Sequence, residues 1–136
     1  MIVCDTGPLV ALLNADDAHH EACVNLLERE RGPVLVPAPV LTEICYLTES
    51  RMGPKTEAAF LDAVAAGEFQ LEQTLPSDLR RMADLVRTYA DFPLGAVDAS
   101  VIAVAERLGV TRVATVDHRH FRAVRPTHCA ALELLP

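Results

Sequence analysis

The chain has 136 residues and a formal net charge of −7 at pH 7. This length allows one domain with its own core, and the acidic balance disfavours a protein that holds nucleic acid through overall charge. Half of the residues are hydrophobic, yet no apolar run approaches the ~20 residues of a membrane-spanning helix. We therefore predict a single domain over residues 1–136, without a membrane segment or secretion signal, in the cytoplasm.

The cysteines are far apart in the sequence, and no two of them form a C-x-x-C pair. Such spacing gives no support to a zinc site, and thiols in apolar surroundings are typical of a reducing compartment. We predict reduced thiols at four positions: Cys4, Cys23, Cys45 and Cys129.

An apolar strand at residues 2–4 opens the chain and ends at Asp5. Gly7 and Pro8 stop the extended conformation, and an apolar helix follows through Leu13. Ligands bind at the carboxyl ends of strands in open α/β sheets, so Asp5 lies where a ligand would bind. Aspartate is also a preferred helix N-cap, and this stretch alone does not separate the two interpretations.

Two further elements follow the first helix. Asp16 and Asp17 are typical helix caps, and apolar residues at helical spacing predict a helix over residues 18–31. A Gly-Pro pair ends that helix, and the apolar run at residues 34–36 predicts a short buried strand.

A third helix is predicted from Pro39, because proline is tolerated in a first helical turn. Glu43 lies three residues after Val40 and four before Leu47, so it shares their apolar face. Burying a glutamate there is costly unless it is paired or binds an ion. A nearby arginine is the structural alternative, and Arg51 is on the same helix.

A Gly-Pro pair at residues 53–54 separates the third helix from a fourth, over residues 55–66. Alternating residues 68–72 predict an edge strand, and a fifth helix begins at Pro76. Apolar residues of this fifth helix are spaced to pack on the sheet: Leu79, Met82, Ala83, Val86 and Tyr89.

The sixth helix, residues 96–105, is almost wholly apolar, which is typical of a core helix. Asp98 is in its first turn, where the helix dipole favours an anion, and this placement is a sufficient structural explanation of the residue. Gly109 is predicted to end the helix in the left-handed conformation.

An apolar strand at residues 112–116 ends in Asp117 and so repeats the arrangement of Asp5. A helical turn at residues 118–121 and a weakly alternating edge strand within residues 130–135 complete the pattern. This element order predicts a three-layer α/β/α sandwich around a mostly parallel central sheet.

Four acids therefore come from strand ends or inward helix faces: Asp5, Glu43, Asp98 and Asp117. Such a pocket needs a hard divalent cation, Mg²⁺ or Mn²⁺, and metal at carboxylates serves phosphoryl chemistry. Because neighbouring carboxylates repel, at least one should have a raised pKa. Three hydroxyl residues flank these acids and are placed to support them by hydrogen bonds: Thr6, Ser100 and Thr115.

At these residues the chain resembles PIN-domain proteins, and among them the VapC toxins of bacterial VapBC toxin–antitoxin modules. The resemblance covers the whole length and rests on four stretches in the family's order: Asp5-Thr6, Leu41-Thr42-Glu43-Ile44, residues 97–102 and residues 115–121.

This resemblance implies a Mg²⁺- or Mn²⁺-dependent endoribonuclease of a bacterium or archaeon, in which the four acids form the catalytic metal site. The family's members cleave structured RNA such as tRNA or rRNA, inhibit translation, act as homodimers and are neutralised by a VapB-like antitoxin. Val97 stands where some relatives have an additional acid, which leaves open one metal or two.

The segment around the last acid is basic, with four arginines and one aspartate, a net charge of +3 that leaves −10 for the rest. Arginines beside a cleavage site are typical phosphate contacts; a solvated basic turn or an antitoxin contact is the alternative. The RNA-contact candidates are Arg112, Arg119, Arg122 and Arg125.

Two other classes are weaker interpretations. A phospho-acceptor receiver domain resembles this fold, but it needs paired acids after the first strand and a late lysine, whereas the only lysine is Lys55. A haloacid-dehalogenase-type phosphatase needs an acid where Gly7 stands. A catalytically silent PIN scaffold that binds only protein is the remaining alternative, and the presence of all four acids disfavours it.

Overall fold

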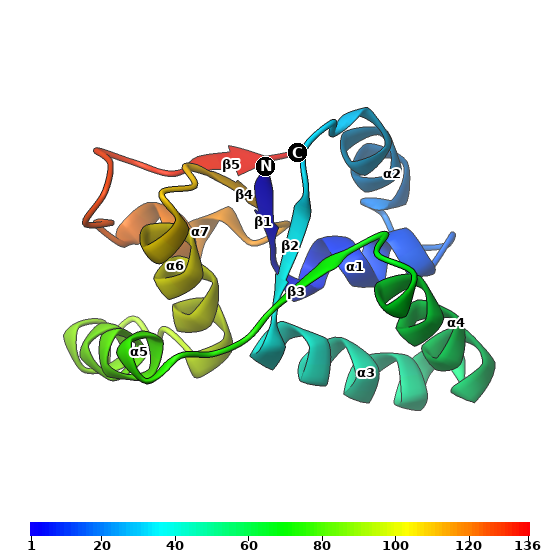
Figure 1. The fold of residues 1–136 in the computed structure, drawn as a ribbon, viewed down its shortest axis with the longest axis horizontal. Coiled ribbons are helices and arrows are strands. Elements are labelled where there is room, and N and C mark those ends of the chain that lie inside the picture. Colours follow the sequence, from blue (N-terminus) through cyan, green and yellow to red (C-terminus); the bar gives the residue numbers. More distant parts are fainter.

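The computed structural model describes residues 1–136. Five short strands form one sheet in the order β3-β2-β1-β4-β5, with β1 (Ile2–Cys4) at its centre (Figure 1). Its neighbours are β2 (Val34–Pro37) and β4 (Arg112–Ala114), and the edges are β3 (Gln70–Glu72) and β5 (Glu133–Leu135). Every pairing is parallel. The predicted α/β class with a mostly parallel sheet is confirmed, and no strand is antiparallel.

Seven helices surround the sheet. In Figure 1, α1, α2 and α4 lie to one side of the strands and α5, α6 and α7 to the other, so the sheet is the middle of three layers. None of the helices is both long enough and apolar enough to cross a membrane. Their bounds are α1 (Thr6–Leu13), α2 (His20–Arg29), α3 (Ala38–Met52), α4 (Pro54–Ala65), α5 (Pro76–Thr88), α6 (Ala96–Leu108) and α7 (His118–Ala123).

The second helix differs from its prediction at the N-terminus. It begins at His20, because the Asp17 carboxylate accepts a hydrogen bond from the His19 N–H at 2.8 Å and forms a turn before the helix. At the other end of the chain, β5 is confined to Glu133–Leu135, the residues that pair with β4. The remaining elements lie close to their predicted positions.

The core confirms the prediction for the sixth helix. Residues 99–105 of α6 are all buried, as are all residues of β1 and β2. Gly109 ends α6 at a φ of +68°, the left-handed conformation in which glycine lacks the steric cost of a Cβ. One cluster of 26 buried apolar residues contains members of both helical layers and of the sheet, so the protein has one core.

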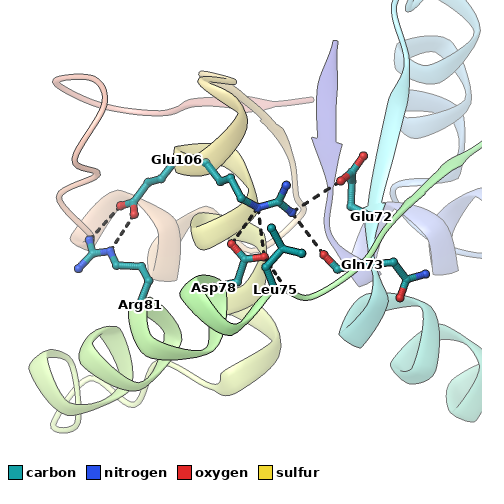
Figure 2. A network of polar contacts seen from close by, with 7 residues as sticks. Glu72, Gln73, Leu75, Asp78, Arg81 and Glu106 are labelled. Atoms are coloured by element: carbon teal, nitrogen blue, oxygen red, sulfur yellow. Dashed lines mark hydrogen bonds and ion pairs between the residues drawn. The ribbon is translucent and has the colours of Figure 1, made fainter.

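Ion pairs connect α5 to α6 (Figure 2). The guanidinium of Arg107 donates to the Asp78 carboxylate at 3.0 Å and to the Gln73 carbonyl at 3.3 Å. One turn along α5, Arg81 donates to both oxygens of Glu106, at 2.7 and 2.9 Å. Each of these acids has an arginine partner, so the network holds the two helices together without uncompensated charge.

The order of the strands reverses at the centre of the sheet. From β1 the chain proceeds to β2 and β3 on one side, and it later returns to β4 and β5 on the other. Such a reversal opens a crevice beyond the carboxyl ends of the strands, which is where open α/β sheets bind ligands. Asp5 follows β1 and Thr115 follows β4, so both residues lie at this point.

Candidate active site

A cavity of about 400 Å³ lies at the reversal, and all four predicted acids line it. Asp5 stands at the N-cap of α1, Glu43 on α3, Asp98 in the first turn of α6 and Asp117 at the N-cap of α7. Four separate elements thus supply one carboxylate each. The structure brings together residues that are up to 112 positions apart in the sequence.

Asp5 is the most deeply buried of the four, with 7% of its surface exposed. Its Oδ1 accepts a hydrogen bond from the Thr6 N–H at 2.8 Å, and its Oδ2 accepts one from the Thr115 hydroxyl at 3.0 Å. Asp5 therefore caps α1 and also lines the cavity, so both interpretations of the residue hold. Because both oxygens are bonded, the orientation of the carboxylate is fixed.

Glu43 is bonded across the cavity to the start of α1. The Thr6 hydroxyl donates to Glu43 Oε2 at 2.6 Å, which joins α1 to α3. Arg51, two turns further along α3, lines the same cavity but forms no ion pair with Glu43. The structural alternative for Glu43, a paired arginine, is therefore not realised.

Close packing and hydrogen bonds place Asp117 relative to Asp5. A Cβ added to Gly7 would lie 2.4 Å from Cγ2 of Val116, so any other residue here would force the Val116 side chain to move as the first turn of α1 approaches the segment after β4. The Asp117 N–H donates to the Thr115 hydroxyl at 3.2 Å, and that hydroxyl in turn donates to Asp5.

His120 lies between two of the acids, at a position for which no role was predicted from the sequence. Its Nδ1 is 3.3 Å from Asp98 Oδ2 and 3.2 Å from Asp117 Oδ2. The imidazole also packs edge-on against Phe92, with ring centroids 5.4 Å apart at an angle of 81°. The sequence does contain a signal: His120 follows Asp117 by three positions in a helical turn, which places both on one face.

The carboxylates are electrostatically perturbed. Burial raises the pKa of Asp5 to about 6; the charges of Asp98 and Glu43 add to this rise, while hydrogen bonds from Thr6 and Thr115 oppose it. Burial also raises the pKa of Asp98, against the attraction of His120. A raised carboxylate pKa was expected from repulsion, but loss of hydration on burial is the larger cause.

Two predicted contacts are not present. The Ser100 hydroxyl donates to the Val97 carbonyl at 2.6 Å and reaches no carboxylate, because a residue two positions after Asp98 on a helix points in another direction. Arg112 begins β4 and therefore lies at the amino end of the sheet, where it pairs with Glu30. Since the acids are at the carboxyl end, the prediction of Arg112 as an RNA contact beside the site is wrong.

The other three arginines of the basic segment remain available. Arg119 and Arg122 are exposed on α7, and Arg125 is exposed just beyond it. The guanidinium of Arg119 lies 5.8 Å from the centroid of the Phe92 ring. Because none of the three forms an ion pair with an acid of this chain, their guanidinium groups are available to bind an anion.

The donor set of the cavity fits a hard divalent cation, since its acids offer oxygen ligands. No three acidic, histidine or cysteine side chains converge closely enough to form a ready-made cage. Mg²⁺ does not need one, because it keeps several water ligands and takes one or two carboxylates. Asp5 in particular is buried with hydrogen bonds but no cationic partner, so a cation would supply the missing charge.

Comparison with known proteins identifies the class. The family model of the PIN domain matches residues 2–125, so the chain belongs to the PIN-domain family. It is also 28% identical over 135 residues to Ribonuclease VapC26 of Mycobacterium tuberculosis, which covers 99% of this chain and 100% of the relative. The family indicated by the sequence resemblance is confirmed.

Solved structures show the same fold. A toxin of Mycobacterium tuberculosis that cleaves the sarcin–ricin loop, VapC20, superposes with a TM-score of 0.86 at 22% identity, and all of both chains is covered. VapBC2 of Rickettsia felis, bound to a DNA fragment of its promoter, gives 0.73 at 16% identity, again over 100% of both chains. FitAcB of Neisseria gonorrhoeae gives 0.72 at 20% identity, over 100% of this chain and 97% of the other.

Proposed function

We propose that this protein is a Mg²⁺- or Mn²⁺-dependent endoribonuclease, the toxin of a type II toxin–antitoxin module that cleaves structured RNA in the cytoplasm and inhibits translation. The observation that carries this proposal is the convergence of four carboxylates, without a paired lysine or arginine, at the strand reversal of a PIN domain. The relationship to Ribonuclease VapC26 supports the ribonuclease class.

The reaction is hydrolysis of a phosphodiester. Water adds to phosphorus and one P–O bond breaks, which leaves a phosphate on one fragment and a hydroxyl on the other. When bound, the metal supplies a Lewis acid and lowers the pKa of bound water. The protein itself orients the carboxylates: Thr6 and Thr115 form hydrogen bonds to both oxygens of Asp5, and Thr6 also bonds to Glu43.

Substrate binding needs positive charge, because the chain is acidic overall and RNA is a polyanion. The unpaired arginines of the α7 region meet this need: Arg119 and Arg122 stand on the helix that Asp117 caps, and Arg125 follows it. VapC20, which shares the fold, is named as cleaving the sarcin–ricin loop, so a ribosomal RNA hairpin or a tRNA is the proposed substrate class.

A VapB-like antitoxin is the proposed partner of a homodimeric toxin, since the structural relatives include toxin–antitoxin complexes. A second cavity, of about 520 Å³ and mainly apolar, includes Leu12, Leu13, Phe60 and Phe69 in its lining. α1 connects the two cavities, because its first residue, Thr6, lines the acidic one. An apolar antitoxin helix fits the second cavity, and a basic side chain beside it can pair with the acids.

The rival acidic-pocket classes find no support. Lys55, the only lysine, lines the apolar cavity and not the acidic one, so no lysine is placed as a receiver domain requires. A haloacid-dehalogenase-type phosphatase needs an acid at the position of Gly7, where an added Cβ would clash with the Val116 side chain.

The proposal is tested with purified protein incubated with total tRNA or deproteinised ribosomal RNA, in Mg²⁺, in Mn²⁺ and in EDTA. We expect discrete RNA fragments only with metal, and none from Asp98→Asn. Asp84→Asn is the matched control, because Asp84 is exposed on α5 and pairs with Arg87. Cleavage that persists in Asp98→Asn, or that ignores EDTA, would contradict the proposal, and a protein that cleaves neither RNA would be the silent scaffold.

A further inference from the structure

We infer that His120 is a positioning residue of the active site, whose Nδ1–H holds the carboxylates of Asp98 and Asp117 together while Phe92 holds the imidazole in place. This inference rests on the proposed nuclease function and adds to the four acids a residue to which the resemblance assigns no role. It follows from four features: the nitrogen shared by the two acids, the absence of another side-chain partner, the packing of the ring and the chemistry of the pair.

One nitrogen serves both acids. Nδ1 of His120 lies at nearly equal distances from Asp98 Oδ2 and Asp117 Oδ2, 3.3 and 3.2 Å. Ionised carboxylate oxygens only accept hydrogen bonds, so the imidazole can attract both acids only in a form that has its hydrogen on Nδ1. The bridge therefore joins the first turn of α6 to the N-cap of α7.

No other side chain pairs with either carboxylate, and the further donor to Asp98 is the backbone N–H of Gly95. Asp117 is 54% exposed, and only its backbone N–H is bonded elsewhere, to Thr115. Asp98 is 22% exposed. Two like charges so close together repel, so without His120 the exposed Asp117 side chain would turn into solvent.

The imidazole is itself fixed. It is 20% exposed, and it packs edge-on against Phe92, which comes from the segment between α5 and α6. Such edge-to-face pairs stabilise a defined ring orientation. The next residue, Phe121, is 2% exposed and anchors the short helix α7 in the core, which sets the direction of His120.

A held pair of carboxylates is what a hard cation needs from a site that has no complete cage. Groups that orient ligands in this way change metal affinity or activity by about 10–100-fold when they are removed. The predicted loss on removing His120 is thus a loss of metal affinity, which can be measured without RNA.

The test replaces the donor while removing the titratable ring. In His120→Asn the amide nitrogen takes the place of Nδ1, whereas His120→Gln carries its amide further out, near Nε2, and His120→Ala has no donor. The dissociation constant of Mn²⁺ is measured at pH 7.5 by isothermal titration calorimetry, and cleavage of total tRNA is measured in parallel. His118→Gln is the matched control, because His118 is on the same helix, its side chain hydrogen-bonds to the Thr115 carbonyl at 3.1 Å, and it forms no ion pair with the acids.

We expect His120→Ala and His120→Gln to bind Mn²⁺ about 10-fold or more weakly, with His120→Asn and His118→Gln close to wild type. Phe92→Ala should weaken binding in the same direction, and His120→Asn should retain cleavage. Melting in EDTA checks that each variant folds. Should His120→Ala fail to fold, the difference in Mn²⁺ affinity between His120→Asn and His120→Gln tests the inference.

Two results would overturn the inference. One is that His120→Asn binds Mn²⁺ as weakly as His120→Gln, and the other is that His120→Ala binds Mn²⁺ at least as tightly as the wild type. If the wild type cleaves tRNA while all His120 variants bind metal normally, only the inference fails. If the wild type and the variants bind Mn²⁺ with the predicted order of affinities but the wild type cleaves no RNA, the proposed nuclease function fails and the positioning role stands. A wild type that neither binds Mn²⁺ nor cleaves RNA contradicts both.

Discussion

The two ends of the central sheet differ in how their acids are compensated: the acid at the amino end has a cationic partner, and the acid at the carboxyl end has none. At the amino end, the side chain of Glu30 is 5% exposed and pairs with Arg112. Burial raises the pKa of Glu30, but hydrogen bonds from the Gly32 N–H and Arg112 outweigh this effect and lower the pKa to about 2. At the carboxyl end, Asp5 is 7% exposed and has no cationic partner, and burial raises its pKa to about 6.

This difference separates an acid paired within the chain from the acids of the proposed metal site. Glu30 as a whole residue is only partly buried whereas Asp5 is buried, and the two acids differ further in that only Glu30 is compensated by a cation of the same chain. The ion pairs that fasten α5 to α6 follow the pattern of Glu30, because Asp78 and Glu106 each have an arginine. An uncompensated buried charge is costly to the folded state, and its presence at the strand reversal supports the proposed metal site.

The largest predicted effect is on RNA cleavage. Asp5→Asn should lower the cleavage rate by at least about 100-fold, because metal-assisted charge stabilisation is worth several kcal/mol and each 1.36 kcal/mol is tenfold. Glu30→Gln, the equivalent change at the amino end, should keep cleavage within a few-fold below its melting temperature, as should Cys45→Ser. Rates are measured on total tRNA at saturating Mg²⁺. Comparable losses from Asp5→Asn and Glu30→Gln would remove the functional distinction between the two ends.

Metal should stabilise the folded protein through the carboxyl end alone. At a hundred times the dissociation constant, binding adds roughly 2.7 kcal/mol to the free energy of unfolding, so Mg²⁺ or Mn²⁺ should raise the melting temperature at pH 7. Glu43→Gln should lose much of that rise. In EDTA it should melt at or above the wild-type temperature, because it removes a repelling charge while its amide oxygen can still accept from Thr6. A clear loss of stability in EDTA would make Glu43 a structural acid.

The smallest effect concerns RNA binding by the basic segment. Neutralising Arg119 and Arg122 together, in an Asp98→Asn background that cannot cleave, should weaken binding of labelled tRNA. The slope of log affinity against log salt should fall by about one per lost phosphate contact. Arg112→Gln should leave the slope unchanged, because Arg112 is at the other end of the sheet and bonded to Glu30. A change of slope only in Arg112→Gln would reverse the assignment.

The parts of the site that follow from strand ends could be predicted from sequence. Asp5 and Asp117 each terminate an apolar run, and parallel strands bring their carboxyl ends to one edge, so their convergence followed from the pattern. The prediction of Arg112 as an RNA contact was wrong for a related reason. Arg112 is close to Asp117 in sequence, but it is the first residue of β4 whereas Asp117 follows the strand's other end, so the two lie at opposite edges of the sheet.

Contacts between elements could not be predicted in the same way. His120 meets Asp98 only because α7 folds back against α6, and no local pattern specifies that approach. Leu79 and Val86 were expected to face the sheet and are 55% and 38% exposed. α5 packs on α6 and not directly on the sheet, so a narrower face of it, with Met82 and Leu85, is buried.

The most direct test of the account compares the free energies of unfolding of wild type, Asp5→Asn and Glu30→Gln in EDTA at pH 7. The pKa of Asp5 rises on folding from its usual 3.8 to about 6, so its ionisation destabilises the fold by about 3 kcal/mol above pH 6 and not at all below pH 3.8. The lowered pKa of Glu30 has the opposite sign: its stabilisation is present above pH 4.5 and is lost toward pH 2. We therefore predict that at pH 7 Asp5→Asn is more stable than wild type, by an amount that vanishes toward pH 4, and that Glu30→Gln is less stable. If both substitutions destabilise the protein at pH 7, Asp5 is a compensated structural acid and the account is contradicted.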